Sequence, residues 1–285
     1  MLRRMRSLLR FEPSHSSSGP HDHAHRQDIA SEQAFFDRYF EDKHEQVAAR
    51  GYPLEARWLQ RARAPRPRPL DYWEYAFHLL GPLPGRRVLD IGCGSGWVTA
   101  YLAAAGAEVM AFDVSFEGCR LAAATLRANA HRSWTAVMDA HAIAVRPNSF
   151  DLAFASGVLH HMDLATVARE VHNLLKPGGR LVFYEPLAYG PIMWALRQGY
   201  LRVKGLREYE TTEHEEGLAL TQLEPFHRLF RTGEVRPFNF VAKTNRLADR
   251  FGRLADTLRW ADYLLFATAP FLTRYCTCVV CRFEK

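Results

Sequence analysis

Residues 87–97 read RVLDIGCGSGW, and this stretch decides the fold class of the chain. Its first half sets apolar residues around a single acid, Asp90, which is the pattern of a buried parallel strand. Three glycines at alternate positions follow, and a helix-like run begins directly after them. Glycine at such a junction lets the backbone turn tightly and approach a ligand with no Cβ in the way. Because ligands of doubly wound sheets lie beyond the carboxyl ends of the strands, the stretch predicts a nucleotide-type pocket.

The spacing of the glycines separates two kinds of nucleotide site. A dinucleotide fingerprint has the form G-x-G-x-x-G, but Trp97 stands where its third glycine should be. The pattern is instead D-x-G-x-G-x-G, with Asp90 two residues before Gly92. It resembles motif I of the class I methyltransferases, which use S-adenosylmethionine (SAM). A nicotinamide oxidoreductase is disfavoured by Trp97 and stays open as an alternative.

The resemblance to this family continues downstream in the expected order. Residues 108–113 resemble the second strand, and its last residue, Asp113, lies 17 residues after Gly96. That is near the distance at which a carboxylate binds the ribose hydroxyls in nucleotide-binding folds. A third strand, 134–138, is followed by Asp139. Residues 149–161 and 174–186 also resemble the family's fourth and fifth strand regions, so the close matches run from about residue 85 to 186.

The alternation of strands and helices predicts a parallel sheet covered by helices on both faces. Together with the resemblance, it implies an α/β, Rossmann-like sheet of seven strands with an antiparallel last strand, an N-terminal helical cap and an insert after strand five. The sixth strand is expected at 234–241, at an edge because of Pro237, and the seventh at 275–283. Ser115 and Asp163 are expected to cap helices, and residues 221–224 have the spacing of a capping box.

The chain divides into three predicted parts. Residues 1–27 are expected to be a disordered tail, 28–70 a helical cap and linker, and 71–285 the methyltransferase domain. Within that domain, residues 187–220 resemble the substrate lids that the family carries at this place. The 190–208 region could equally be a packed helix, or a basic amphipathic helix that makes transient contact with a membrane surface. Tyr72 and Trp73 either close over the pocket or pack the first helix on the sheet.

Composition narrows the class of protein. The chain has 285 residues, 48% of them hydrophobic and 24% charged, which is ordinary for a globular protein. Its net charge of +6 comes with arginine clusters outside the motif-bearing core, so a solvated tail and linker are favoured over nucleic-acid binding. Without a secretory signal core, and with five cysteines in no regular framework, the chain is expected to be cytoplasmic. The oligomeric state is left open.

The resemblance implies a set of cofactor-binding residues. The glycine loop would pass the amino-acid part of SAM, Asp90 would fix this loop or the α-amino group, and Asp113 would bind the ribose. Asp139 and the backbone of Ala140 would meet the adenine. The full set is Asp90, Gly92, Cys93, Gly94, Gly96, Asp113, Val114, Asp139, Ala140 and Ser156. Asp90 could instead have a structural role in the loop, and Asp113 could instead be an acid at a helix N-terminus.

Catalytic residues are harder to name, because methyl transfer depends mainly on aligning the two reactants. Oxygen and nitrogen nucleophiles can need a base, and histidine suits that role near neutral pH. His161 is the first candidate and His160 the second, since both follow the fourth strand. Tyr184 and Glu185 are candidates for substrate contact, and His214 in the insert is a remote candidate base.

The loop after the fourth strand indicates which class of substrate to expect. The (Asp/Asn)-Pro-Pro-(Tyr/Phe) loop of nucleic-acid amino-methyltransferases is replaced by ASGV at 155–158. We therefore expect methyl transfer to an oxygen, nitrogen or carbon of a small, apolar or aromatic metabolite, and no nucleic-acid partner. A non-catalytic SAM-binding regulator or partner protein is the main alternative. No metal is expected, because the histidines at 21–25 and the cysteines at 276, 278 and 281 lack a regular ligand set.

Overall fold

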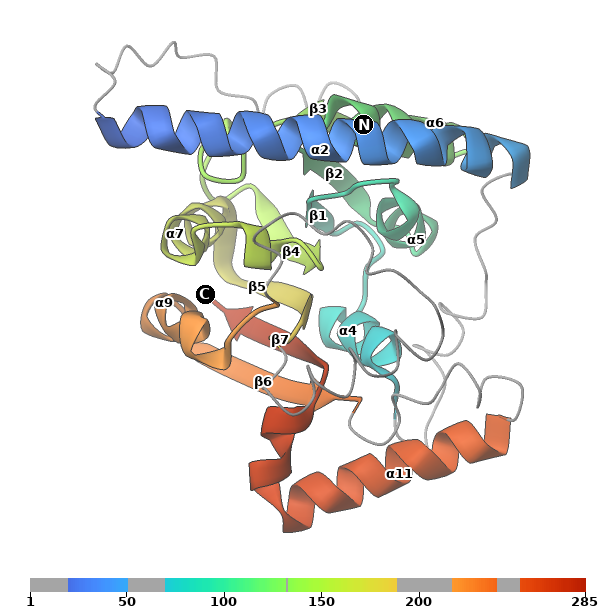
Figure 1. Ribbon diagram of the computed structural model, residues 1–285, viewed down its shortest axis with the longest axis vertical. Helices are drawn as coiled ribbons and strands as arrows, with labels where there is room; N and C mark the ends of the chain where they lie inside the picture. Colours follow the sequence, from blue (N-terminus) through green and yellow to red (C-terminus); the bar gives the residue numbers. More distant parts are fainter. Residues whose placement is uncertain (1–19, 51–69, 132, 189–216, 240–251) are drawn as a thin grey trace, which may run out of the picture.

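The computed structural model describes residues 20–50, 70–131, 133–188, 217–239 and 252–285. Seven strands form one sheet in the order β3-β2-β1-β4-β5-β7-β6 (Figure 1). The first five run parallel, and β7 lies antiparallel between β5 and β6. The predicted α/β class and the antiparallel last strand are confirmed. The strands are β1 Arg87–Ile91, β2 Glu108–Asp113, β3 Trp134–Val137, β4 Phe150–Ser156, β5 Leu175–Pro186, β6 Thr232–Phe238 and β7 Cys278–Glu284.

Helices cover both faces of this sheet, as a parallel sheet requires. Neighbouring strand residues serve opposite faces: Leu89 packs in the cluster under α7 and α9, whereas Val88 packs in the cluster under α4 and α5. The helices are α2 Pro20–Arg50, α4 Tyr72–Leu80, α5 Trp97–Ala104, α6 Phe116–Ala128, α7 Leu164–Leu174, α9 Glu224–Leu229 and α11 Gly252–Thr268. Short 3₁₀ turns are η1 Leu159–His161, η2 Leu220–Leu223 and η4 Pro270–Tyr275.

Two of the three predicted helix caps are present. The Ser115 hydroxyl accepts a hydrogen bond from the backbone N–H of Gly118, and the Asp163 carboxylate accepts from the first turn of α7. The capping box expected at 221–224 is wrong. Thr221 lies inside η2, and the α-helix starts only at Glu224 with a proline in its first turn.

The C-terminal strands lie where the sequence predicts, with shifted ends. β6 is an edge strand that pairs only with β7 among the described residues, which suits Pro237 because its nitrogen has no hydrogen to donate. β7 begins at Cys278, three residues later than predicted, because residues 270–275 form η4 instead of extended chain. Between them, α11 lies at the far end of the molecule from α2 (Figure 1).

The N-terminal cap is one long helix. α2 begins at Pro20, so residues 20–27, which we expected in the tail, are helical, and residues 1–19 lie outside the described part. α2 crosses the β2–β3 end of the sheet beside α6 (Figure 1). No helix within the described ranges is both long and apolar enough to cross a membrane.

Most of the insert after β5, including the 190–208 helix and His214, lies outside the described residues. Its two ends are described. Leu187 and Leu218 form an isolated β-bridge, and the Leu218 N–H donates to the carbonyl of Pro186 at 2.8 Å. Both leucines are buried in the cluster under α7. The chain thus returns to the sheet at the place where it left.

Candidate functional site

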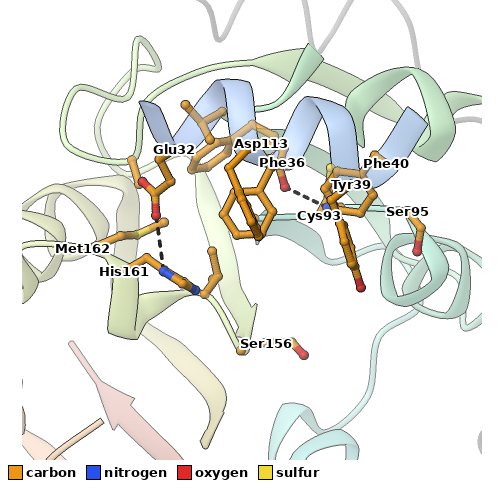
Figure 2. Close-up of a pocket in the computed structure, with 18 of the residues that line it drawn as sticks. Glu32, Phe36, Tyr39, Phe40, Cys93, Ser95, Asp113, Ser156, His161 and Met162 are labelled. Carbon is orange, nitrogen blue, oxygen red and sulfur yellow. Dashed lines mark hydrogen bonds and ion pairs between the residues drawn. The ribbon is translucent and has the colours of Figure 1, made fainter. Parts of the chain in front are cut away.

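A cavity of about 1080 Å³ lies at the carboxyl ends of β1, β2 and β4, between the glycine loop and α2 (Figure 2). This is the place at which an open α/β sheet binds its ligand. The cavity wall includes nine of the predicted cofactor residues, namely Asp90, Gly92, Cys93, Gly94, Asp113, Val114, Asp139, Ala140 and Ser156. Gly96 alone of that set is outside the wall.

Glycine is required at each of the three loop positions, but for a different structural reason at each. All three have positive φ, which only glycine adopts without strain. A Cβ on Gly92 would lie 2.4 Å from Val158 Cγ2, and one on Gly94 would lie 2.9 Å from Phe40 Cζ on α2. A Cβ on Gly96 would lie 2.6 Å from the backbone of Ala122. Gly92 and Gly94 therefore shape the cavity, and Gly96 lets α5 approach α6.

Two buried carboxylates lie beneath this loop. Asp113 accepts hydrogen bonds from the backbone N–H groups of Gly94 (2.8 Å) and Ser115 (2.9 Å), so it ties the loop to the end of β2. Asp90 accepts a hydrogen bond from the Thr99 hydroxyl at 2.6 Å. Burial raises the pKa of both acids, and that of Asp90 reaches about 7 because burial outweighs the Thr99 bond. Asp90 thus carries a proton readily at neutral pH.

Asp139 is held by a residue that sequence reasoning missed. The Asp139 carboxylate lies 2.7 Å from His141 Nδ1 and accepts the backbone N–H of His141. The other ring nitrogen of His141 accepts a hydrogen bond from the N–H of Asp163, so Nδ1 carries the hydrogen and donates to Asp139. This bond raises the pKa of His141. The part of the cavity wall around Asp139 is thereby fixed to the start of α7.

His160 and His161 have separate environments although they are neighbours in η1. His160 Nδ1 lies 2.6 Å from Glu185 Oε2, and the other oxygen of Glu185 accepts the N–H groups of Val158 and Leu159. Glu185 is completely buried, and neither it nor His160 lines the cavity. These two residues therefore build the turn after β4. Only His161 of the pair faces the cavity.

His161 meets α2 through two side chains. Glu32 Oε1 lies 3.4 Å from His161 Nδ1, and the Phe36 ring stands edge-on to the imidazole at 5.6 Å between ring centres (Figure 2). Burial lowers the pKa of His161 to about 4, with the neighbouring His160 adding to the effect. Burial also raises the pKa of Glu32 to about 7. Near neutral pH the imidazole is neutral and the Glu32 carboxyl exchanges its proton readily.

Glu32, Phe36 and Phe40 occupy one face of α2, because residues four apart in a helix share a face. Phe36 and Phe40 are stacked at 6.2 Å, and Phe40 reaches the glycine loop. Asp37 attaches the helix to α6 by accepting from the Ser115 hydroxyl (2.6 Å) and the Glu117 N–H (3.1 Å). The sequence shows the aromatic residues of this helix but not the importance of Glu32. Its spacing, one turn before Phe36, is the signal that could have identified it.

Three expected contacts lie outside the cavity wall. Tyr72 stacks on Tyr184 at 4.8 Å, and Trp73 packs edge-on against Trp97 at 4.5 Å. Neither Tyr72 nor Trp73 lines the cavity, so of the two alternatives these residues pack α4 on the sheet. Tyr184 is part of this packing and is likewise absent from the wall.

The five cysteines are all free and buried. Cys278 and Cys281 belong to the two opposite core clusters, and burial raises the pKa of both thiols. Among the described residues no group of three or more His, Cys, Asp or Glu is placed to hold a metal ion. The side chains of the histidines at 21–25 lie outside the described part.

Comparisons with known proteins agree with this geometry. Residues 89–183 match a family model described as a methyltransferase domain. The ubiquinone biosynthesis O-methyltransferase of Ralstonia nicotianae is 39% identical over 105 residues, which cover 36% of this chain and 44% of that protein. The protein of the same name from Sodalis glossinidius is 33% identical over 159 residues, 54% of this chain and 61% of that one. The chain thus spans about half the length of the curated relatives it matches.

A solved structure shows the same fold. A provisionally assigned methyltransferase of Bacillus halodurans aligns with a TM-score of 0.50 and 16% identity, covering 74% of this chain and 97% of that one. The glycine loop lies inside the matched region, residues 89–183, and the five parallel strands β1 to β5 largely coincide with it. Residues 89–183 of this chain are thus similar in sequence and strand arrangement to the methyltransferase domain of class I SAM-dependent methyltransferases.

Proposed function

We propose that this chain transfers the methyl group of SAM to a hydroxyl oxygen of a small apolar or aromatic molecule. The observation that carries the proposal is one cavity with two chemically different ends. Its volume of about 1080 Å³ lies slightly above the range of ordinary single-ligand sites, which are about 300–1,000 Å³. Such a cavity has room for a cofactor and an acceptor side by side.

The glycine-loop end suits the cofactor. Asp113, which ends β2, would bind the ribose, and Asp139 with Ala140, beyond β3, would meet the adenine. Gly92 and Gly94 keep the loop free of side chains, and Asp90 supplies a carboxylate beneath it. When bound there, SAM supplies a methyl group activated by its positive sulfur. Carboxyl groups along the wall complement that charge.

The opposite end suits an apolar acceptor. Phe36 and Met162 lie beside the His161–Glu32 pair there, and this pair provides the ionisable groups (Figure 2). Aromatic walls with a few polar groups are typical of sites that orient small organic molecules. Correct orientation alone can lower a reaction barrier by about 7–11 kcal/mol. The names of the O-methyltransferase relatives support oxygen as the methylated atom.

The proposal is tested in two steps. Calorimetry with SAM and its demethylated product should show binding that is lost in Asp113→Ala. Methyl-labelled SAM should then label an apolar phenol, with 4-tert-butylcatechol as the first probe and fractionated lysate as the second, and mass spectrometry should locate the methyl group on oxygen. SAM binding without transfer to any acceptor would support a non-catalytic SAM-binding protein. Binding of a nicotinamide dinucleotide in place of SAM would contradict the proposal outright.

A further inference from the structure

The two histidines of η1 are each paired with a carboxylate, but the two carboxylates come from different parts of the molecule. Glu185, the partner of His160, belongs to β5 and is fully buried in the sheet. Glu32, the partner of His161, belongs to the cap helix α2 and lines the cavity. The first pair is a fixed part of the sheet. The second pair exists only while α2 lies on the domain.

We propose that His161 accepts the proton of the substrate hydroxyl and that Glu32, carried on α2, is the positioning residue that makes His161 a base. This inference rests on the proposed methyl transfer and names its acceptor class as a weakly acidic hydroxyl, such as a phenol. A phenol has a pKa near 10, so an imidazole base can accept its proton. An aliphatic alcohol has a much higher pKa, so an imidazole base cannot accept its proton in the same way.

The geometry places each group for its role. Glu32 Oε1 is 3.4 Å from His161 Nδ1, and the second ring nitrogen of His161 is turned away from Glu32, on the side of Ser156 (Figure 2). Ser156 ends β4 and also lines the cavity. Phe36, one helical turn after Glu32, holds the imidazole from its edge. One ring nitrogen thus faces the carboxylate and the other remains for the acceptor.

The proton on Glu32 decides which ring nitrogen of His161 can act. While the Glu32 carboxyl is protonated it donates to Nδ1, so the hydrogen of the neutral ring is on Nε2 and that atom cannot accept. Once Glu32 is ionised, Nδ1–H donates to the carboxylate and Nε2 presents a lone pair to the substrate. Since burial raises the pKa of Glu32 to about 7, the change occurs near neutral pH.

Several charged groups surround this pair and influence the pH at which Glu32 ionises. Asp113 at the end of β2 and Asp139 after β3 raise the pKa of Glu32, whereas His141 and His160 lower it. His160 also lowers the pKa of His161. The loss of water contributes most at both residues. Burial of α2 against the domain is therefore the main cause of both pKa shifts.

The step balances as follows. The acceptor oxygen forms a bond to the methyl carbon while the bond between that carbon and sulfur breaks, and the electron pair of the broken bond stays on sulfur. The hydroxyl proton passes to His161 Nε2, and the resulting imidazolium is stabilised by the Glu32 carboxylate. The products are the methyl ether, a neutral thioether and a protonated histidine. The proton leaves to solvent afterwards.

Imidazole NMR tests the inference without any acceptor. In the full chain with ¹⁵N-labelled histidine, His161, assigned through His161→Ala, should change from the Nε2–H to the Nδ1–H form as pH rises through about 7. In Glu32→Gln the amide oxygen accepts from Nδ1–H at every pH, so the change should disappear. Glu41→Gln, an exposed change on the same helix, should behave like the native chain. A change of the same form and midpoint in Glu32→Gln would overturn the inference.

Kinetics with 4-tert-butylcatechol gives a second readout. The native chain should show kcat rising with pH through about 7. Glu32→Gln should lose this rise between pH 6 and 8 and lower kcat on the order of 10²-fold, with the KM for SAM changed less than threefold. An unchanged pH profile in Glu32→Gln contradicts the role of Glu32. Absence of turnover in the native chain contradicts the proposed function instead, and the NMR result remains interpretable.

Discussion

The glycine loop shows how single atoms shape the cofactor end of the cavity. Gly92 has φ +65°, and a Cβ there would overlap Val158 in the turn that leads to His161. Gly85 has φ +74°, with no atom within 4 Å of an added Cβ. The two positions separate the effect of backbone strain from the effect of a collision.

Gly92→Ala should lose at least tenfold in SAM affinity, because the clash displaces either the loop or the Val158 turn. Gly85→Ala should leave the affinity unchanged and cost about 1–2 kcal/mol in free energy of unfolding, the strain of a left-handed residue with a side chain. Calorimetry and urea denaturation measure the two effects. Equal SAM affinity in both variants would show that the clash at residue 92 is relieved without cost.

Glu185 shows a second effect at this scale. Its carboxylate accepts two backbone N–H groups and faces His160, and Glu185 itself has no exposure to water. In Glu185→Gln one oxygen becomes an NH₂ group that cannot accept from a donor. We expect a loss of about 1–3 kcal/mol in the free energy of unfolding, measured by urea denaturation. The same change at exposed Glu41 should alter stability by less than about 0.5 kcal/mol.

At the scale of elements, α2 is the part that sequence reasoning described least well. Its aromatic residues indicate a helix, but they do not show which face meets the cavity or that the helix starts at Pro20. The strands and the Ser115 and Asp163 caps could be predicted because their signals are local. The capping box at 221–224 failed because Pro225 fits the first turn of a helix that begins at Glu224.

Asp37 is the polar anchor of α2, so its removal should loosen this helix selectively. Asp37→Ala leaves the Ser115 hydroxyl and the Glu117 N–H without their acceptor. Bonds to a charged acceptor contribute about 1.5–3 kcal/mol each. Amide hydrogen exchange should therefore accelerate in α2 by tenfold or more and stay unchanged in β1 and β4. Glu41→Ala serves as the control, and uniform acceleration in both variants would contradict an anchoring role.

For the whole molecule, the buried acids predict an unusual dependence of stability on pH. Asp90 and Glu32 both have a pKa raised to about 7, so the folded state keeps two protons that the unfolded state releases above about pH 4.5. The stability from these groups is complete at low pH and falls as pH rises toward 7. His161, with its pKa lowered to about 4, opposes this trend but contributes only one proton.

Asp90→Asn isolates the contribution of Asp90. The variant cannot ionise, so relative to the native chain its free energy of unfolding should increase between pH 5 and 8, on the order of a few kcal/mol. Urea denaturation of both proteins at several pH values, in the absence of cofactor, measures the difference. A constant difference across this range would show that Asp90 has an ordinary pKa in the folded chain.

How much of the function could be predicted depends on how far apart in the sequence the contacting residues lie. The cofactor end lies within one strand–loop–helix unit and three further strand ends, and nine of its ten expected residues line the cavity. The acceptor end joins Glu32 and Phe36 to His161 across more than a hundred residues, and local patterns contain no record of that pairing. His160 and Glu185 looked functional because they lie near His161 and at a strand end, yet Glu185 is fully buried and the His160 side chain, only 5% exposed, is turned to it.

The bridge between Leu187 and Leu218 has a consequence for how such enzymes diversify. Because both ends of the intervening stretch are fastened at one point, its length can change without disturbing any pairing within the sheet. Doubling a loop costs only about 0.6 kcal/mol in closure entropy. Evolution, or an engineer building chimeras, can therefore replace this stretch by one of another length or sequence while the sheet and the cavity residues stay the same.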